Sequence, residues 1–148
     1  MMIEVPLSKA VRLISPRLTV LVNTVDEKGE LNSSPYSWIF PLSFDPPFIG
    51  VGIGGKKKYT YIKLWERQGF HTEKSKKVNV PRIREARAVL ECKVKQFVEL
   101  AGDHIILVGE VLYAAAEEGG LDAIRPLLHD SGEKFRSIGK EIVLKRRR

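Results

Sequence analysis

The feature that most constrains the fold is a pair of apolar stretches separated by a tight turn. Residues 88–100 alternate apolar and polar side chains, and residues 104–115 form a second apolar run. The turn between them, residues 101–103, has glycine at its centre. Two such stretches joined by so short a turn predict a long antiparallel hairpin. A chain built around this hairpin is expected to have a mainly β fold.

The first third of the chain adds a meander of further strands. Residues 18–25 are rich in β-branched side chains, and residues 26–29 form a turn that ends in glycine, where positive φ is common. Residues 45–47 are Asp-Pro-Pro and should interrupt the ladder, because proline has no N–H to donate. Many strands and few helices predict a closed or partly closed barrel. The expected strands outside the hairpin are residues 18–25, 30–34, 38–43, a glycine-weakened 48–53, and a short one near 135–138.

A basic, glycine-containing loop leads into the clearest helix signal. Two glycines precede three lysines, and Thr60 is a good N-cap for a helix over residues 61–68. A helix start leaves about four N–H groups unpaired and carries partial positive charge, so a phosphate there would meet free amides, Lys58 and the Thr60 hydroxyl. A solvated lysine run on a surface turn explains the same window equally well. A second, short helix is expected at residues 121–125.

Length and cysteine content limit the class of protein. The 148 residues, 43% of them hydrophobic, suit a single domain over residues 1–148. One cysteine, Cys92, excludes an internal disulfide and favours a reducing compartment. No apolar run approaches the ~20 residues of a membrane span, and the N-terminus does not resemble a signal peptide, so a cytoplasmic protein without a membrane partner is expected. The basic tail, residues 145–148, is expected to be disordered.

The net charge of +7 favours an anionic partner, which can be a phosphate-bearing cofactor, a nucleic acid or an acidic protein. Aromatic side chains do not interleave with the basic tail, so a solvated tail is favoured over a nucleic-acid arm. A nucleic-acid partner ranks last, because a barrel shape by itself is no evidence for one. His71, His104 and His129 lie far apart in sequence, and none has a partner at metal-ligand spacing, so no metal site is predicted. His104 follows a turn, and we expect it to be structural rather than catalytic.

A small, polar and then aromatic segment, residues 32–38, lies between two expected strands. It can offer backbone N–H and C=O groups and short hydroxyls to a flat heteroaromatic ring. Taken alone, an ordinary polar edge strand with a bend at Pro35 explains it better.

The succession of these segments resembles the flavin reductase-like family of FMN-binding split barrels, and by pattern its flavoredoxin-type branch. The similarity covers most of the chain in the same order. The stretches that carry it are residues 18–29, 32–38, 41–47, 58–60, 81–93, 103–111 and 126–129. The resemblance implies a mainly β, antiparallel, Greek-key-like split barrel with a few short helices, and FMN as cofactor.

The resemblance also implies where FMN binds. The segment that lies along the isoalloxazine ring corresponds to Asn32, Ser34, Ser37 and Trp38. Ser43 matches a serine near the ribityl chain or the phosphate, and Lys58 and Thr60 match the residues at the phosphate, in agreement with the argument from the helix start. His129 falls where family members often place a residue near the open face of the flavin or across a dimer interface.

One departure from the family follows Phe70. Family members continue there with a core strand, a helix and a loop, whereas this chain passes at once to residues 71–78, which resemble sequence found well beyond that insert. Either the protein lacks this segment, or the printed chain omits it. Loss of a barrel strand would leave neighbouring N–H groups in need of new partners. FMN binding should survive, whereas a nicotinamide subsite is less secure.

Three functions follow as hypotheses. The first is an oxidoreductase in which NADH or NADPH passes hydride to FMN, which needs no side-chain base because the cofactor carries the chemistry. The second is a non-enzymatic FMN-binding electron carrier, and the third a basic nucleic-acid-binding barrel. A small barrel has too little concavity to enclose FMN alone, so we expect a two-fold homodimer with flavin at its interface.

Overall fold

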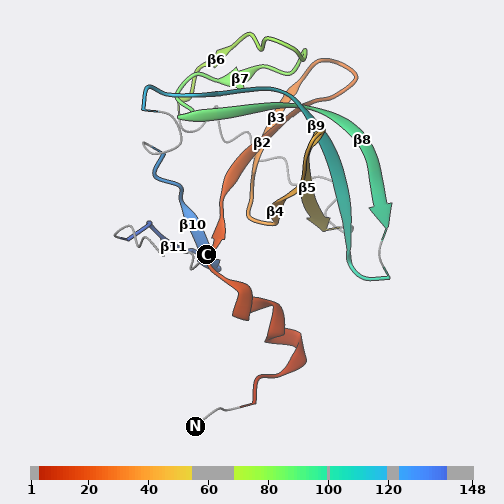
Figure 1. Ribbon diagram of the computed structural model, residues 1–148, viewed down its shortest axis with the longest axis vertical. Coiled ribbons are helices and arrows are strands. Elements are labelled where there is room, and N and C mark those ends of the chain that lie inside the picture. Colours follow the sequence, from red (N-terminus) through yellow and green to blue (C-terminus); the bar gives the residue numbers. More distant parts are fainter. Residues whose placement is uncertain (1–3, 55–68, 100, 120–123, 140–148) are drawn as a thin grey trace, which may run out of the picture.

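The structure, a computed structural model, describes residues 4–54, 69–99, 101–119 and 124–139. Within these ranges the protein is mainly β, as predicted, and one 3-10 helix, η1 (Leu7–Ile14), precedes the strands (Figure 1). The strands are β1 (Arg17–Leu18), β2 (Val20–Val25), β3 (Leu31–Tyr36), β4 (Ile39–Phe44), β5 (Pro47–Gly54), β6 (Thr72–Glu73), β7 (Arg82–Ile83), β8 (Ala88–Glu99), β9 (His104–Ala116), β10 (Leu128–Ser131) and β11 (Lys134–Arg136).

The largest sheet has the strand order β4-β5-β9-β8, with every neighbouring pair antiparallel. Its β8–β9 pair confirms the long hairpin predicted from the sequence, and the pairing runs from Ala88↔Ala116 to Glu99↔Ile105. Two register shifts interrupt this pairing, between Glu91 and Cys92 and between Val94 and Gln96. Bulges increase the local twist of a strand, and Figure 1 shows β8 and β9 curving together over the body.

The predicted N-terminal hairpin is confirmed as β2 and β3, and Asp26 closes its turn. Asp26 Oδ1 accepts hydrogen bonds from the backbone N–H groups of Lys28 at 2.9 Å and Glu30 at 2.8 Å. Gly29 has φ of 81°, a conformation that glycine adopts without steric cost. The predicted turn chemistry therefore sets the register that places β3, the first part of the expected site, along β2.

The two ends of the chain meet in a small sheet that local patterns do not predict. β1 pairs with β10, with Arg17 opposite His129, and β10 pairs with β11. Between β1 and β2, the N–H of Thr19 donates to the carbonyl of Leu127 at 2.8 Å. The short strand expected near residues 135–138 is found as β11, whereas β10 and η1 were not expected.

Other expectations fall partly or wholly outside the described residues. Ile124 and Arg125 are irregular rather than helical, and the rest of the short helix expected at residues 121–125 lies outside the described ranges. The helix expected over residues 61–68 lies outside them entirely. The described strands form four separate sheets, so the barrel stays a prediction.

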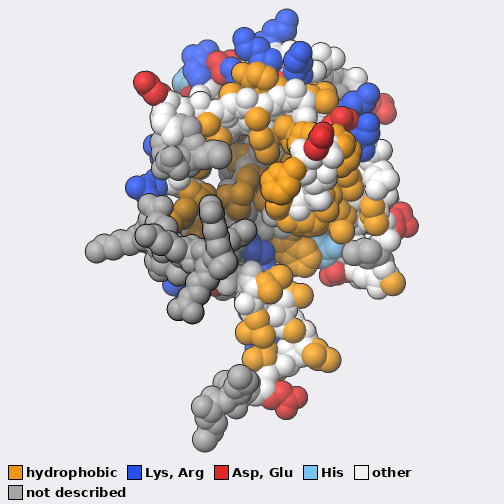
Figure 2. All heavy atoms as spheres, in the orientation of Figure 1, with side chains coloured by type: hydrophobic (Ala, Val, Ile, Leu, Met, Phe, Trp, Pro, Cys, Tyr) orange, Lys and Arg blue, Asp and Glu red, His pale blue; other side chains and the backbone are white. Residues whose placement is uncertain are grey.

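Few apolar side chains of the described residues are buried. Val51, Ile83 and Val108 are the buried members. Because Gly50 pairs with Val108, the side chains of Val51 and Val108 lie on opposite faces of the central sheet. Many large apolar side chains remain exposed, and Figure 2 shows such side chains on the body and along η1. The described part of the chain thus leaves apolar surface for other groups to cover.

Candidate functional site

Three glycines of β5 lie on one face of the strand and leave room for three aromatic rings. A Cβ atom added at Gly50 would lie 2.6 Å from the ring of Phe40, and one at Gly52 would lie 3.1 Å from Trp38. A Cβ atom at Gly54 would lie 3.6 Å from Nε2 of His104. The glycines that weaken β5 by propensity therefore have a packing role, because any larger residue at Gly50 or Gly52 collides with a ring.

The rings of Trp38 and His104 stack on each other. Their centroids are 4.2 Å apart and their planes differ by 13°. Asp103 Oδ1 lies 2.7 Å from Nδ1 of His104 and orients the imidazole. The carbonyl of Trp38 accepts a hydrogen bond from the N–H of Gly52 at 2.8 Å, which fixes the backbone under the indole. Trp38 still exposes 36% of its surface, so this aromatic row is accessible.

Arg17 brings a positive charge to the same place. Its guanidinium carbon lies 5.6 Å from the centroid of the Trp38 ring, within cation–π range. Its Nη1 donates to the carbonyl of Val11 at 3.2 Å, whereas its Nε is buried and has no acceptor among the described residues. A buried cationic N–H without an acceptor costs free energy unless a ligand or water satisfies it.

Ser37 and His129, both predicted site residues, are brought together by the β1–β10 pairing. Ser37 Oγ lies 3.1 Å from Nδ1 of His129, and Nε2 of His129 lies 3.0 Å from the carbonyl oxygen of Gly132. Because a carbonyl oxygen only accepts, Nε2 carries the hydrogen in this arrangement, and the Ser37 hydroxyl donates to Nδ1. Phe135 packs against the imidazole, with 5.1 Å between the ring centroids. The lone pairs of the Ser37 oxygen remain able to accept from a ligand.

The other predicted site residues lie on β3, on β4 or outside the described part of the chain. Asn32 and Ser34 lie on β3, where Ser34 Oγ donates to Asn32 Oδ1 at 3.5 Å. Ser43 lies on β4 opposite Phe48, just after a register shift. Lys58 and Thr60 lie outside the described residues, and β5, which leads towards them, ends at Gly54 beside His104.

A polar pair, Ser33 and Asn23, lies across the β2–β3 ladder. Ser33 is fully buried, and its hydroxyl has no hydrogen-bond partner in the described ranges. It is opposite Asn23, whose side-chain N–H donates to the carbonyl of Pro81 at 3.2 Å, while no described residue donates to the buried Asn23 Oδ1. This pair connects the β2–β3 hairpin to the loop after β6.

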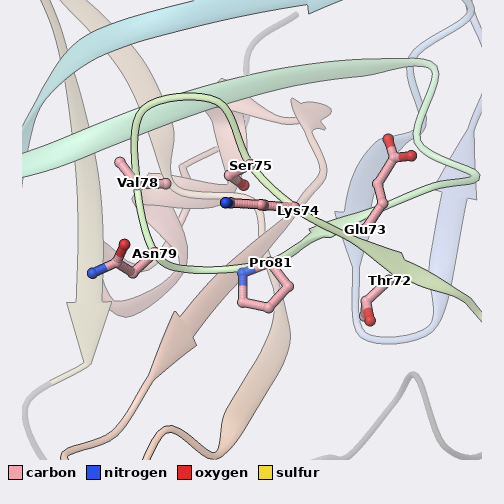
Figure 3. Close-up of a pocket in the computed structure, with 7 residues that line it drawn as sticks. All are labelled: Thr72, Glu73, Lys74, Ser75, Val78, Asn79 and Pro81. Atoms are coloured by element: carbon pink, nitrogen blue, oxygen red, sulfur yellow. The ribbon is translucent and has the colours of Figure 1, made fainter.

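That loop lines a hollow of about 370 Å³ (Figure 3). None of its lining residues belongs to the aromatic row. Glu91 holds its shape, because the carboxylate accepts hydrogen bonds from the N–H groups of Lys76 and Lys77. Burial raises the pKa of the Glu91 carboxyl, but these backbone bonds and the charge of Arg82 outweigh it, so the pKa lies below its ordinary value. The lining residues are Thr72, Glu73, Lys74, Ser75, Val78, Asn79 and Pro81.

Sequence reasoning missed the contributions of Arg17 and His104 to this site. His104 was expected to be structural, and the structure places it against a predicted cofactor residue, Trp38. One signal was present in the sequence, since glycine alternates at residues 50, 52 and 54. Alternation puts the three glycines on one face of a strand, and His104 is paired with the last of them. The role of Arg17 depends on tertiary packing and left no such signal.

Comparisons with known proteins identify the family. The family model described as the flavin reductase like domain matches residues 62–139. An uncharacterized protein of Archaeoglobus fulgidus is 33% identical, with 86% of this chain and 88% of that protein covered. The uncharacterized protein YwrF of Bacillus subtilis is 24% identical, with 88% of each chain covered.

Solved structures share the fold. The nitrilotriacetate monooxygenase component B from Bacillus cereus superposes with a TM-score of 0.84 at 18% identity, covering 97% of this chain and 99% of that one. The flavoredoxin of Desulfovibrio vulgaris superposes with a TM-score of 0.71 at 15% identity, covering 87% and 90%.

The alignments also bear on the shortened middle of the chain. The Archaeoglobus alignment extends over 160 positions and the Bacillus alignment over 180, more than the 148 residues of this chain, although only part of the chain takes part in each. Both relatives therefore have residues inside the aligned region without a counterpart here, and the location of the gap after Phe70 stays a prediction.

The family model covers more than half of the chain, and the Archaeoglobus relative is 33% identical across most of it. The chain therefore belongs to the flavin reductase-like domain family.

Proposed function

We propose that this protein is an FMN-binding flavoprotein that works as an NAD(P)H-dependent flavin reductase. The observation that carries the proposal is the aromatic row of Phe40, Trp38 and His104 across the glycines of β5. It offers an accessible flat surface beside the polar segment that the family uses for the ring. Family membership narrows the ligand of such a surface to a flavin, and the net charge of +7 suits a flavin that carries a phosphate.

The residues present fit an isoalloxazine ring. Within the described part of the chain the buried Nε of Arg17 lacks an acceptor, and the Ser37 oxygen has lone pairs to spare. A ring that carries both carbonyl and N–H groups satisfies both needs. We assign the ring to Asn32, Ser34, Ser37 and Trp38, the ribityl chain or phosphate to Ser43, and the phosphate to Lys58 and Thr60.

When bound, FMN supplies hydride acceptance from a reduced nicotinamide and electron delivery to an acceptor. The residues of this chain would bind the flavin ring, orient it and shift its reduction potential. Trp38, held by Gly52 and stacked on His104, gives the ring a fixed wall. Arg17 places positive charge beside that wall, which favours an anionic reduced ring over a neutral oxidised one. His129 holds the Ser37 hydroxyl in one orientation.

The proposal extends to fold and assembly. We infer that the described sheets are parts of one split barrel, the architecture named for a related structure from Shewanella frigidimarina with a TM-score of 0.71. We also infer a two-fold homodimer, because the described part of one chain leaves the aromatic row and much apolar surface uncovered. Sedimentation of the flavin-loaded protein tests this, and a monomer that retains tightly bound flavin contradicts it.

Two measurements test the assignment. The visible spectrum of freshly purified protein, followed by identification of the released chromophore, tests flavin binding. Reconstitution with excess FMN should quench tryptophan fluorescence, and a Trp38→Leu variant should bind FMN at least tenfold more weakly. Lys134→Gln, an exposed change on β11, is the matched control. If excess FMN stays entirely free in solution, the proposal fails.

A second candidate, an electron carrier without reductase activity, is favoured by the internal shortening. A segment missing near the flavin would remove part of a nicotinamide subsite while leaving the FMN contacts in place. Anaerobic mixing with NADH and with NADPH separates the two candidates. Bleaching of the flavin absorbance at catalytic rates supports the reductase, and a stable oxidised spectrum with either donor supports the carrier.

A further inference from the structure

The N-terminal helix η1 presents an apolar surface that the described part of its own chain leaves uncovered. None of its eight residues is buried, and Leu7 is 91% exposed. A 3-10 helix has about three residues per turn, so every third residue lies in one column. Two of its columns are largely apolar and one is basic. The first apolar column holds Leu7, Ala10 and Leu13. The second apolar column holds Val11 and Ile14, and the basic column holds Lys9 and Arg12.

Contacts at the base of η1 set its direction. Arg17 Nη1 donates to the carbonyl of Val11 at 3.2 Å, and the same guanidinium lies over the Trp38 ring. The N–H of Ser15 donates to the carbonyl of Arg12 at 3.2 Å and ends the helix. Figure 1 shows η1 projecting away from the body, on the side opposite β6 and β7. η1 thus stands clear of the body, and Arg17 links its backbone to the Trp38 ring.

A second uncovered apolar surface lies on β4, which begins directly after Trp38. β4 is an edge strand of the four-stranded sheet. It exposes Phe40, Leu42 and Phe44, and Phe44 is 97% exposed. An exposed edge that carries large apolar side chains is a surface at which chains associate.

We propose that η1 of one protomer packs against β4 of a second copy of this chain, and that the two copies exchange this contact about a two-fold axis. Both surfaces adjoin Trp38, since Arg17 anchors η1 beside its ring and β4 starts at the next residue. In a two-fold dimer each contact occurs twice. An axis near Trp38 therefore covers both helices and both β4 edges at once. This inference rests on the proposed dimer and names the elements that form it.

The area available agrees with this assignment. A fully buried large apolar side chain removes about 60–120 Å² from water. Leu7, Leu13, Ile14 and Phe44 together therefore remove about 240–480 Å² per protomer. A standard interface buries about 800 Å² on each partner, so the exchanged contact supplies roughly 30–60% of it. A second copy of the chain supplies a matching apolar surface for each of the two elements, β4 for η1 and η1 for β4, which favours it as the occupant.

Disulfide trapping between two differently tagged chains tests the contact. Both chains carry Cys92→Ser, which removes the native thiol. One also carries Leu13→Cys and the other Phe44→Cys, and the mixture is refolded and oxidised. The expected product is a disulfide that joins the two differently tagged chains. Its yield should be at least tenfold higher than with Lys9→Cys, on the basic column, in place of Leu13→Cys. Equal yields from the two positions, or no product, overturn the proposal.

A chain that carries both Leu13→Cys and Phe44→Cys on the Cys92→Ser background tests the intramolecular alternative. We expect it to form covalent dimers, and a monomer with an internal disulfide shows that η1 folds onto its own body and overturns the proposal. Separately, Leu13→Glu with Ile14→Glu should weaken dimerisation at least tenfold in sedimentation, whereas Lys9→Gln with Arg12→Gln should not. Because η1 buries no residue in the monomer, circular dichroism of both variants should match the wild type.

The outcomes separate this inference from the proposed dimer. A wild-type dimer that gives no Leu13–Phe44 trapping refutes the η1–β4 contact and leaves the dimer standing. A wild-type monomer at all concentrations, with or without FMN, refutes both. Binding of η1 to anionic lipid vesicles that is abolished by Leu13→Glu, together with no trapping, assigns η1 to a membrane surface and overturns the proposal.

Discussion

Replacing Glu91 by glutamine tests whether the loop after β6 is held by one carboxylate. Glu91 is 4% exposed. The N–H of Lys76 donates to its two oxygens at 2.9 and 3.0 Å, and the N–H of Lys77 donates to Oε2 at 2.6 Å. Glutamine keeps one acceptor oxygen but turns an NH₂ group towards these donors. One backbone N–H loses its partner and the other loses a charged acceptor.

The magnitude follows from these bonds. A hydrogen bond to a charged group contributes about 1.5–3 kcal/mol, a neutral one about 0.5–1.5 kcal/mol, and an unsatisfied buried donor costs about 1–3 kcal/mol. We therefore expect Glu91→Gln to lower the free energy of unfolding by about 2–4 kcal/mol. Urea unfolding of the two proteins at pH 7 measures the difference.

The matched control is Glu110→Gln on β9. Glu110 forms an ion pair with Lys95 at 3.0 Å, and both side chains are partly exposed. Such a pair contributes less than about 1 kcal/mol, so the control should lie close to wild type. If Glu91→Gln and Glu110→Gln destabilise the protein equally, the loop does not depend on the buried carboxylate and the reasoning is wrong.

Acid adds a second readout of the same group. The folded-state pKa of Glu91 is below its ordinary value, because the backbone bonds outweigh burial. Between the folded pKa and the unfolded pKa of about 4.3, the unfolded state binds more protons, so stability rises with pH. The stabilisation is present above the unfolded pKa and is lost as the pH falls through the folded pKa. Unfolding curves between about pH 6 and 3 should show a smaller acid loss for Glu91→Gln than for wild type.

Three further predictions concern the flavin site. Gly52→Ala places a methyl group 3.1 Å from Trp38, whose carbonyl is hydrogen-bonded to the N–H of residue 52. The indole must shift, so FMN affinity should fall at least fivefold. Fluorescence titration measures this against Gly102→Ala, whose added methyl group meets nothing within 4 Å. Ser37→Ala should weaken FMN binding severalfold and change the nitrogen chemical shifts of His129, and unchanged shifts would show that the bond does not form in solution. Arg17→Gln should weaken the preference for binding reduced over oxidised flavin about tenfold, which lowers the two-electron reduction potential of the bound flavin by about 30 mV. An unchanged potential in a redox titration contradicts the charge assignment.

Local chemistry in the sequence determined the hairpins. The 88–100 and 104–115 pattern, its short turn, and the Asp-x-x-Gly turn at residues 26–29 each place their own strands, because the contacts involved join neighbouring segments. The resemblance then pointed to the segment around Ser37 and Trp38 as the ring site. The glycines of β5 were expected only to weaken the strand, since propensity describes the backbone and not the ring that lies above it.

Tertiary structure decided the rest. Ser37 meets His129 because β1 pairs with β10, a contact between the two ends of the chain that no local pattern encodes. Arg17 reaches Trp38, and His104 stacks on it, because three separate segments converge on one face of β5. Periodicity reports which residues share a face of one strand, whereas the choice of what covers that face depends on the free energy of packing in the whole fold.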